Sequence, residues 1–231
     1  MRSTGVIAYK DKWLVEASYD MTLNEQRLML TCVGMLNPRE PVPDEITIHA
    51  ADLLRHFPDI GETNVARELS KAVNKLWDRS IIVRDPSQEK EFRWIDSRVK
   101  YFKGEARATI SFSPAVKKYL SEFSGVFAKI ALENVSGLQS AYSLRLYEMC
   151  MQFIKAGNRL ITIEEFRFMM ATKDKYKDFR DMKKRVIEPA VAEINEKTNL
   201  DITVAKLRKH GRSYSHLHFI FKEKEQLSLP I

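Results

Sequence analysis

One order of predicted elements (a helix, a strand, two helices, a strand and a hairpin) occurs twice along the chain of 231 residues. Hydrophobic periodicity and turn residues place the first copy at 22–36, 46–48, 50–56, 64–79, 81–83 and 92–112. They place the second copy at 140–156, 160–163, 164–171, 178–197, 201–207 and 214–222. A chain that repeats one supersecondary unit has to bury the apolar faces of each copy, which restricts the folds open to it.

Short sequence matches accompany the repeated order. The two longest are Arg27-Leu28 with Arg145-Leu146, at a shift of 118, and Ile46-Thr47-Ile48 with Ile161-Thr162-Ile163, at a shift of 115. Helices followed by a β-hairpin are the elements of a winged-helix unit, in which the third helix enters the DNA groove. We therefore predict an α+β chain of two tandem winged-helix domains related by internal duplication, at 1–131 and 132–231.

Composition fits a chain with a buried core. Hydrophobic residues make up 44% and charged residues 30%, so the chain is not of the disordered class. No run approaches the roughly 20 apolar residues of a membrane span, and no signal peptide is evident. The two cysteines, Cys32 and Cys150, lie in apolar helical patterns, which argues against a disulfide framework or a cysteine zinc site. We expect a cytoplasmic protein with no membrane partner.

Positive charge is concentrated in the second copy. Residues 1–135 hold 20 lysines and arginines against 19 acidic residues, whereas residues 136–231 hold 18 against 12. One basic cluster, within 13 positions, consists of Lys173, Lys175, Lys177, Arg180, Lys183, Lys184 and Arg185. A second, within seven positions, consists of Lys206, Arg208, Lys209 and Arg212. Two basic clusters in one domain make nucleic acid the leading partner.

The helix expected at 178–197, here called the basic helix, has the pattern of a DNA recognition helix. At about 100° per residue, its apolar face consists of Met182, Val186, Ile187, Ala190, Val191 and Ile194. Lys183 falls on that apolar side, so its ammonium has to reach solvent by extending the stem. Pro189 interrupts the pattern, and the helix is either kinked there or divided into two pieces. The predicted DNA contacts of this domain are Lys177, Arg180, Lys183, Lys184, Arg185, Lys206, Arg208, Lys209 and Arg212.

The corresponding helix of the first domain carries less charge. Its outward face presents Asn64, Arg67, Lys71 and Asn74, opposed by Asp78. This face suits weaker DNA contacts or contacts with another protein, and we include Asn64, Arg67 and Lys71 among the predicted DNA contacts.

The helix at 140–156 has a narrow polar stripe on an otherwise apolar surface. The stripe consists of Arg145, Glu148, Gln152 and Lys155. A helix that is apolar over most of its circumference is mostly buried, and we predict that it lies where the two domains meet.

Two other patterns suggest chemistry that the chain does not support. His216 and His218 flank one apolar residue on a predicted strand, as in metal-dependent rolling-circle nickases. That reaction needs a nearby tyrosine nucleophile, and none occurs among the 13 residues after His218. We predict no catalytic residue, no metal and no cofactor. Trp94, Tyr101 and Phe102 are either stacking platforms for single-stranded DNA or sheet-packing residues, and packing is favoured.

Several stretches resemble the iteron-binding plasmid replication initiators. They are Leu14–Tyr19, Thr22–Leu28, Tyr142–Glu148, Phe179–Arg185, Lys209–Arg212 and His216–Phe219. The resemblance covers nearly the whole chain in the same order. The sequence departs from the family pattern in two ways. Lysines stand where some relatives carry arginines, which weakens bidentate guanine contacts. His218 stands where an aliphatic residue is common.

The resemblance implies a function for each domain. The C-terminal domain would supply the main sequence-specific contacts to double-stranded origin repeats (iterons), with Arg180, Lys183, Lys184 and Arg185 on the helix and Lys209 and Arg212 on the wing. The N-terminal domain would add auxiliary DNA contacts and join a homodimer in equilibrium with monomer. Further implied partners are single-stranded origin DNA, the host initiator and the replicative helicase, in a bacterial cytoplasm.

Three functions follow from these observations. The leading hypothesis is a non-enzymatic plasmid replication initiator that promotes origin opening, recruits host replication proteins and represses its own promoter as a dimer. The alternative is a winged-helix transcriptional repressor without initiator activity. A nickase that uses His216 and His218 is the third, and the missing tyrosine argues against it.

Overall fold

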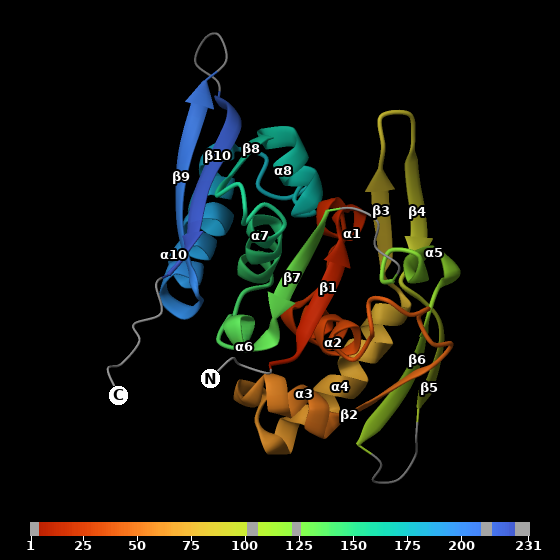
Figure 1. The fold of residues 1–231 in the computed structure, drawn as a ribbon. Helices are drawn as coiled ribbons and strands as arrows, with labels where there is room; N and C mark the ends of the chain where they lie inside the picture. The colour runs from red at the N-terminus through yellow and green to blue at the C-terminus, as the bar shows by residue number, and fades with distance from the viewer. Residues whose placement is uncertain (1–4, 101–105, 122–125, 209–213, 225–231) are drawn as a thin grey trace, which may run out of the picture.

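The computed structural model describes residues 5–100, 106–121, 126–208 and 214–224, and the two predicted copies form two units of its fold (Figure 1). The first unit contains α2 (Leu23–Gly34), β2 (Ile46–His49), α3 (Ala50–His56), η1 (Pro58–Ile60), α4 (Glu62–Trp77), β5 (Ile95–Lys100) and β6 (Arg107–Phe112). The second contains α7 (Ala141–Met151), β8 (Asn158–Thr162), α8 (Ile163–Met169), α9 (Phe179–Met182), η2 (Lys183–Ile187), α10 (Glu188–Lys197), β9 (Leu200–Arg208) and β10 (Tyr214–Glu223).

The three-stranded sheets of the two units have the same topology. In the first sheet β2 pairs with β6 and β6 pairs with β5, and in the second β8 pairs with β10 and β10 pairs with β9. All of these pairings are antiparallel. In both sheets, the short strand after the first helix therefore joins the last strand of the hairpin. This shared topology confirms the predicted α+β fold of two duplicated winged-helix units.

The first unit also contains elements that the sequence pattern did not predict. A two-stranded sheet of β1 (Ile7–Asp11) and β7 (Phe127–Ala131) lies in the middle of the molecule, between the two units (Figure 1). Short helices α1 (Lys12–Glu16) and α6 (Leu132–Val135) follow these strands. Strand β1 packs on α2 and β7 packs on α7, so this sheet connects the first helices of the two units.

The hairpin predicted at 92–112 begins later than expected, at Ile95, because the chain changes sheets at Trp94. Residues 89–93 form β4, which pairs with β3 (Ser80–Arg84) as a separate hairpin, and β5 then pairs with β6. Trp94 is 1% exposed, and its ring meets that of Tyr19 edge-on at a centroid distance of 5.1 Å. This buried ring holds the bend between the two strands, as the sheet-packing interpretation expected, whereas Tyr101 and Phe102 lie outside the described residues.

The apolar core is continuous across both units. It includes Leu28 of α2, Ile110 of β6, Leu146 of α7 and Phe219 of β10. The thiols of Cys32 and Cys150 are free and buried, and burial raises the pKa of each. Across the part of the chain that the structure describes, no helix has the length and apolar character needed to cross a bilayer.

The repeated arginines of α2 and α7 are both buried. Arg27 is 3% exposed and donates hydrogen bonds to Asp59 and to the carbonyl of Leu138, each at 2.9 Å. Arg145 is 2% exposed and donates to the carbonyls of Val15 and Ala17 at 2.9 and 3.0 Å. Each guanidinium thus ties its helix to the backbone of another segment, Leu138 for Arg27 and the end of α1 for Arg145. The repeated arginine therefore has a similar structural role in the two units.

Candidate nucleic-acid interface

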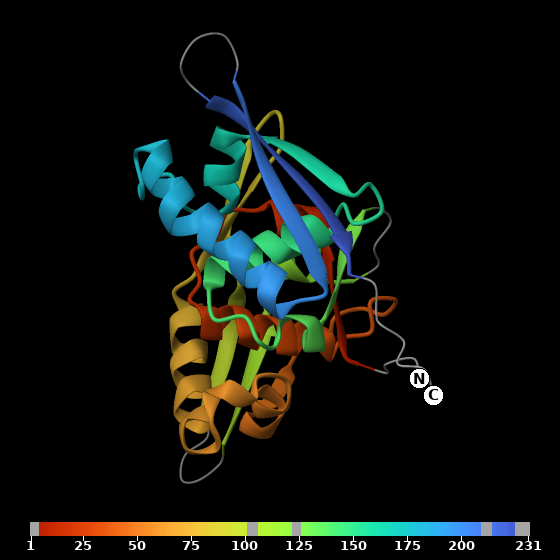
Figure 2. The same ribbon diagram turned by 90° about the vertical axis from the view of Figure 1, so that its left-hand side faces the viewer.

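The third helices of the two units lie on the same side of the molecule. Figure 2 shows α4 along the lower part of one edge and the start of the basic helix above it at the same edge, from where the basic helix runs across the front of the molecule; the hairpins β5–β6 and β9–β10 extend to opposite ends. A duplex along this edge would meet the recognition helix of each unit and one hairpin on either side, as winged-helix domains use these elements. We therefore take this edge as the candidate interface.

Local hydrogen bonds determine where the basic helix begins. The carboxylate of Asp178 caps α9 by accepting from the backbone amide of Arg180 at 2.7 Å. From α8, the guanidinium of Arg167 donates to the carbonyls of Tyr176 at 2.8 Å and Lys177 at 3.1 Å. The loop before the helix is held to the preceding helix in this way, so the exposed Lys177 lies next to the first turn.

The basic helix buries its apolar face and exposes most of its cations. Met182, Val186, Ile187, Ala190 and Ile194 are each at most 1% exposed. Lys177, Arg180, Lys184 and Arg185 are exposed, and none of these four has an ion-pair partner among the residues that the structure describes. Cations without protein partners are available to phosphate oxygens or to the acceptor edge of guanine.

Lys183 differs from the other predicted contacts. Its side chain is 35% exposed, and its ammonium pairs with Glu188 at 2.5 Å. Lys183 was expected on the apolar side, but Met182 takes the buried position and Lys183 lies at its edge. A cation that already has a carboxylate partner gains less from a phosphate, so Lys183 is a weaker candidate than its neighbours.

Pro189 neither ends nor divides the basic helix. Residues 183–187 form one wide turn, η2, in which the amide of Glu188 donates to the carbonyl of Lys183, five residues earlier. The helix then continues as α10 to Lys197. A π turn of this kind is uncommon and is frequent at functional sites.

The exposed face of α4 carries cations that share one carboxylate. Glu68 pairs with Lys71 at 3.0 Å and with Arg67 at 3.4 Å, and Arg67 also donates to Asn64 at 2.6 Å. The hydrogen bond from Lys71 is the main reason that the pKa of Glu68 is lowered. A cleft of about 540 Å³ adjoins this face and is also lined by Arg27, Asp59 and Gln139. The three predicted contacts thus lie together, but their charge is partly neutralised.

The second-unit hairpin carries the remaining predicted contacts. Lys206 and Arg208 lie on β9, opposite Leu217 and Tyr214 of β10, and nothing further is described of their side chains. Lys209 and Arg212 lie outside the described residues. On β10, Leu217, Phe219 and Phe221 are buried while His216 and His218 are half-exposed, as predicted. Within the described ranges, no group of three or more histidine, cysteine, aspartate or glutamate side chains could hold a metal.

Two family models match the chain, one described as "Initiator Replication protein, WH1" over residues 7–151 and one as "Initiator Rep protein, WH2" over residues 162–221. The chain belongs to this family of replication initiators. The family consists of initiators with winged-helix domains, not of enzymes. A replication initiation protein of Escherichia coli is 27% identical over 234 residues, covering 97% of this chain and 72% of the relative.

Solved structures share the fold of this initiator. The crystal structure of the Pi initiator protein in complex with iteron DNA matches with a TM-score of 0.81 and 22% identity, covering 97% of this chain and 100% of that one. Domains 2 and 3 of RctB match with a TM-score of 0.53 and 10% identity, covering 97% and 94%. At these identities the likeness is one of fold, and it agrees with the two winged-helix units seen here.

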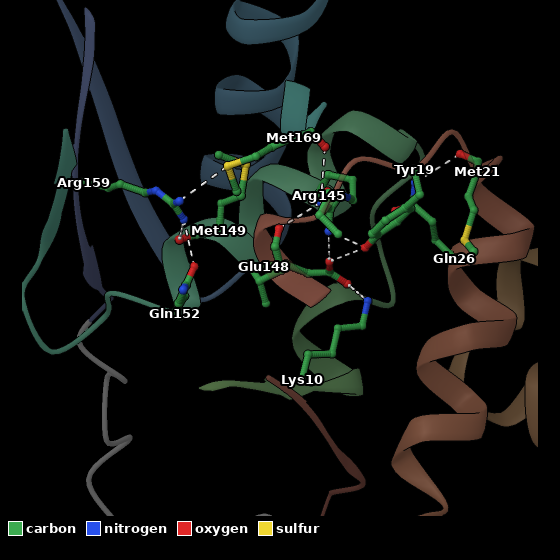
Figure 3. A network of polar contacts seen from close by, with 12 residues as sticks. Lys10, Tyr19, Met21, Gln26, Arg145, Glu148, Met149, Gln152, Arg159 and Met169 are labelled. Atoms are coloured by element: carbon green, nitrogen blue, oxygen red, sulfur yellow. Dashed lines mark hydrogen bonds and ion pairs between the residues drawn. The ribbon is translucent and has the colours of Figure 1, made fainter. Parts of the chain in front are cut away.

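The initiator also has a buried ionic network between its units, which sequence reasoning missed (Figure 3). The carboxylate of Glu148 on α7 pairs with Lys10 of β1 at 2.5 Å and with Arg145 at 2.8 Å, and accepts from the hydroxyl of Tyr19 at 3.3 Å. Arg145 also donates to the Tyr19 hydroxyl and, at 3.2 Å, to the carbonyl of Met169 at the end of α8. The Glu148 carboxylate thus connects three segments: β1, α7, and the loop that precedes α2. Arg145 connects the end of α8 to the same network.

The first three residues of the polar stripe are therefore not a solvated face, whereas Lys155 lies beyond the end of α7 and is exposed. Arg145 and Glu148 are 2% and 0% exposed, and Gln152 bonds to Glu16 of α1 at 2.9 Å and accepts from Arg159 at 2.9 Å. The sequence did contain a signal for this network: Arg145 and Glu148 have opposite charges three residues apart, on a helix that is otherwise too apolar to be exposed. The prediction that this helix is buried between the units is confirmed, because α7 packs against α1, α2 and α10.

Proposed function

We propose that this initiator binds directly repeated duplex sites, iterons, at a plasmid origin, mainly through the start of the basic helix. The observation that carries the proposal is a set of exposed cations, Arg180, Lys184 and Arg185, on the third helix of a winged-helix unit, with no ion-pair partner among the described residues. The Pi initiator, which shares the fold, forms a complex with iteron DNA. Side chains early in a recognition helix meet base edges, whereas hairpin cations suit phosphate.

The two domains contribute unequally in this proposal. Residues 132–231 would supply most of the specific contacts, because Arg180, Lys184 and Arg185 have no carboxylate partner among the described residues. Residues 1–131 would add weaker contacts through Asn64, Arg67 and Lys71, whose charge is shared with Glu68. We assign homodimerisation and repression of the initiator's own promoter to the N-terminal domain on the basis of the family resemblance.

Binding of the repeats is proposed to lead to replication. Bound initiator would help to open the adjacent duplex, contact the separated strand, and recruit the host initiator and replicative helicase. The resemblance over nearly the whole chain supports these steps. The test is a plasmid that lacks its own replicon and carries the repeats from the native locus: it should replicate in bacteria only when the initiator is supplied in trans. Repression of a reporter promoter without replication would instead establish a repressor.

Arg185→Ala tests the proposed reading of bases. If Arg185 contacts guanine, its removal should cost about 1–3 kcal/mol on the matched repeat and relax the preference at one position. The measurement is a titration on matched and scrambled duplexes at several salt concentrations. Arg39→Ala, in an exposed loop of the first unit, is the control and should leave both affinities unchanged. An equal loss on both duplexes for Arg185→Ala would assign this side chain to phosphate.

A further inference from the structure

The wide turn in the basic helix coincides with a proline that cannot continue a regular helix. Pro189 has no amide hydrogen, and in an α-helix its ring would collide with the carbonyl of Arg185, four residues earlier. In the structure the bond of the preceding residue runs from the amide of Glu188 to the carbonyl of Lys183, across five residues instead of four. A wider turn moves the Arg185 carbonyl away from the ring and relieves this collision.

The extra residue in the turn changes which side chains face the core. In an uninterrupted α-helix, Lys183 would lie about 20° from Ala190, at the centre of the buried face, and Met182 about 80° away. The structure shows the opposite: Met182 is 0% exposed and the Lys183 side chain is 35% exposed. One added residue shifts everything before the turn by one helical position, which places Met182 at the centre and moves Lys183 to the flank.

The same shift brings the free cations to the outward side. Without the added residue, Arg180 would lie about 80° from Ala190, at the edge of the buried face, and with it Arg180 lies about 180° away. Lys184 and Arg185 occur inside the turn and are both exposed. The wide turn therefore presents Arg180, Lys184 and Arg185 to one side of the helix, where the proposed DNA lies.

We propose that Pro189 is a positioning residue for DNA recognition: it holds the turn at Lys183–Ile187 open and thereby directs Arg180, Lys184 and Arg185 into the groove. This inference rests on the proposed binding of duplex repeats by the basic helix. Pro189 itself is exposed and has no chemistry to offer to DNA bases, so its effect is exerted through the path of the helix.

Pro189→Ala tests this role directly. The substitution restores an amide that can donate to the Arg185 carbonyl, but the closed turn would carry Lys183 to the buried centre in place of Met182, so the melting temperature should fall. The preference for a matched over a scrambled repeat should fall at least tenfold. The new amide at position 189 should be protected from hydrogen exchange, which reports directly that the turn has closed.

A second variant removes the turn without disturbing the apolar face. Deleting Lys184 together with Pro189→Ala shortens the helix by the added residue, so Met182 stays at the buried centre. This variant should remain folded and regain the preference for the matched repeat, because Arg180 then stays about 180° from Ala190 and Lys183 takes the outward position of Lys184. Pro114→Ala, at the first position of helix α5 (Pro114–Lys117) in the other unit, is the matched control and should leave the preference unchanged.

The outcomes decide between the alternatives. A protected amide at position 189 with unchanged preference would show that the turn does not position the cations, and would overturn the inference. An amide that exchanges freely would show that Pro189 does not hold the turn, and would overturn it as well. If the unaltered initiator shows no preference for the repeats, the proposed function itself fails. That result is distinct from a failure of the inference about Pro189.

Discussion

Glu148→Gln should destabilise the initiator by about 3–5 kcal/mol, because it removes the only carboxylate of the described buried network and leaves two cations without it. Lys10, Arg145 and Glu148 are each at most 3% exposed. The attraction between them offsets a large desolvation cost, which remains for Lys10 and Arg145 when the carboxylate is neutral. Urea denaturation of the full chain measures the change in free energy of unfolding.

Glu16→Gln is the matched control for this prediction. Glu16 pairs with Arg159 at 3.4 Å, and its side chain is 36% exposed, so its removal should cost at most about 1 kcal/mol. Equal losses for the two variants would show that burial of the Glu148 network has no special energetic role. A double variant, Lys10→Met with Glu148→Gln, should recover part of the loss, because only one buried cation then remains.

The same carboxylate should make stability depend on pH. Burial alone would raise the pKa of Glu148, but the charges of Lys10 and Arg145 outweigh it and hold this pKa below its ordinary value. A lowered pKa contributes stability above the unfolded value of about 4.3, and this contribution disappears as pH falls through the folded pKa. The free energy of unfolding of the unaltered protein should therefore decrease more steeply below about pH 4.3 than that of Glu148→Gln.

Replacing Lys177, Arg180 and Lys184 together by glutamine should weaken binding to every duplex by about a hundredfold at about 0.15 M salt. Each lost phosphate contact lowers the slope of log affinity against log salt by about 0.9, so three lower it by about 2.7. Because Arg180 and Lys184 are proposed to enter the groove, the loss should be at least as large on matched repeats as on scrambled ones, whereas the part due to phosphate contacts is the same on both. Binding titrations from about 0.05 to 0.3 M salt provide the slope.

The first unit offers a matched comparison. Arg67→Gln with Lys71→Gln removes two exposed cations from the corresponding helix, where both already pair with Glu68. Because Glu68 already neutralises part of their charge, these two cations contribute less to phosphate binding. The slope of log affinity against log salt should therefore fall by clearly less than about 0.9 per residue. A full loss per residue would mean that Glu68 does not neutralise them and that the two units share binding equally.

Elements with strong local periodicity were predicted from the sequence. The helices at α2, α4 and α7, the strands β2 and β8, and the hairpin β9–β10 follow from apolar spacing of 3.6 or two residues and from capping and turn residues. The repeated order of these elements led to the duplicated winged-helix fold, and their charge pattern led to the basic helix. The exposed candidates Arg180, Lys184 and Arg185 were identifiable because a solvated face needs only local spacing to be recognised.

The tertiary structure alone decided what depends on contacts between distant segments. Strands β1 and β7 pair across more than a hundred positions, as in Ile7 with Ala131, and neither has a distinctive pattern of its own. Lys10 and Glu148 are 138 residues apart, so nothing local marks either as a partner of the other. The wide turn before Pro189 could not be predicted from the sequence either. The proline shows that a regular α-helix is interrupted there, but it does not show which conformation replaces it. Packing selects the answer, since only the turn with an added residue buries Met182 and leaves Lys183 half-exposed.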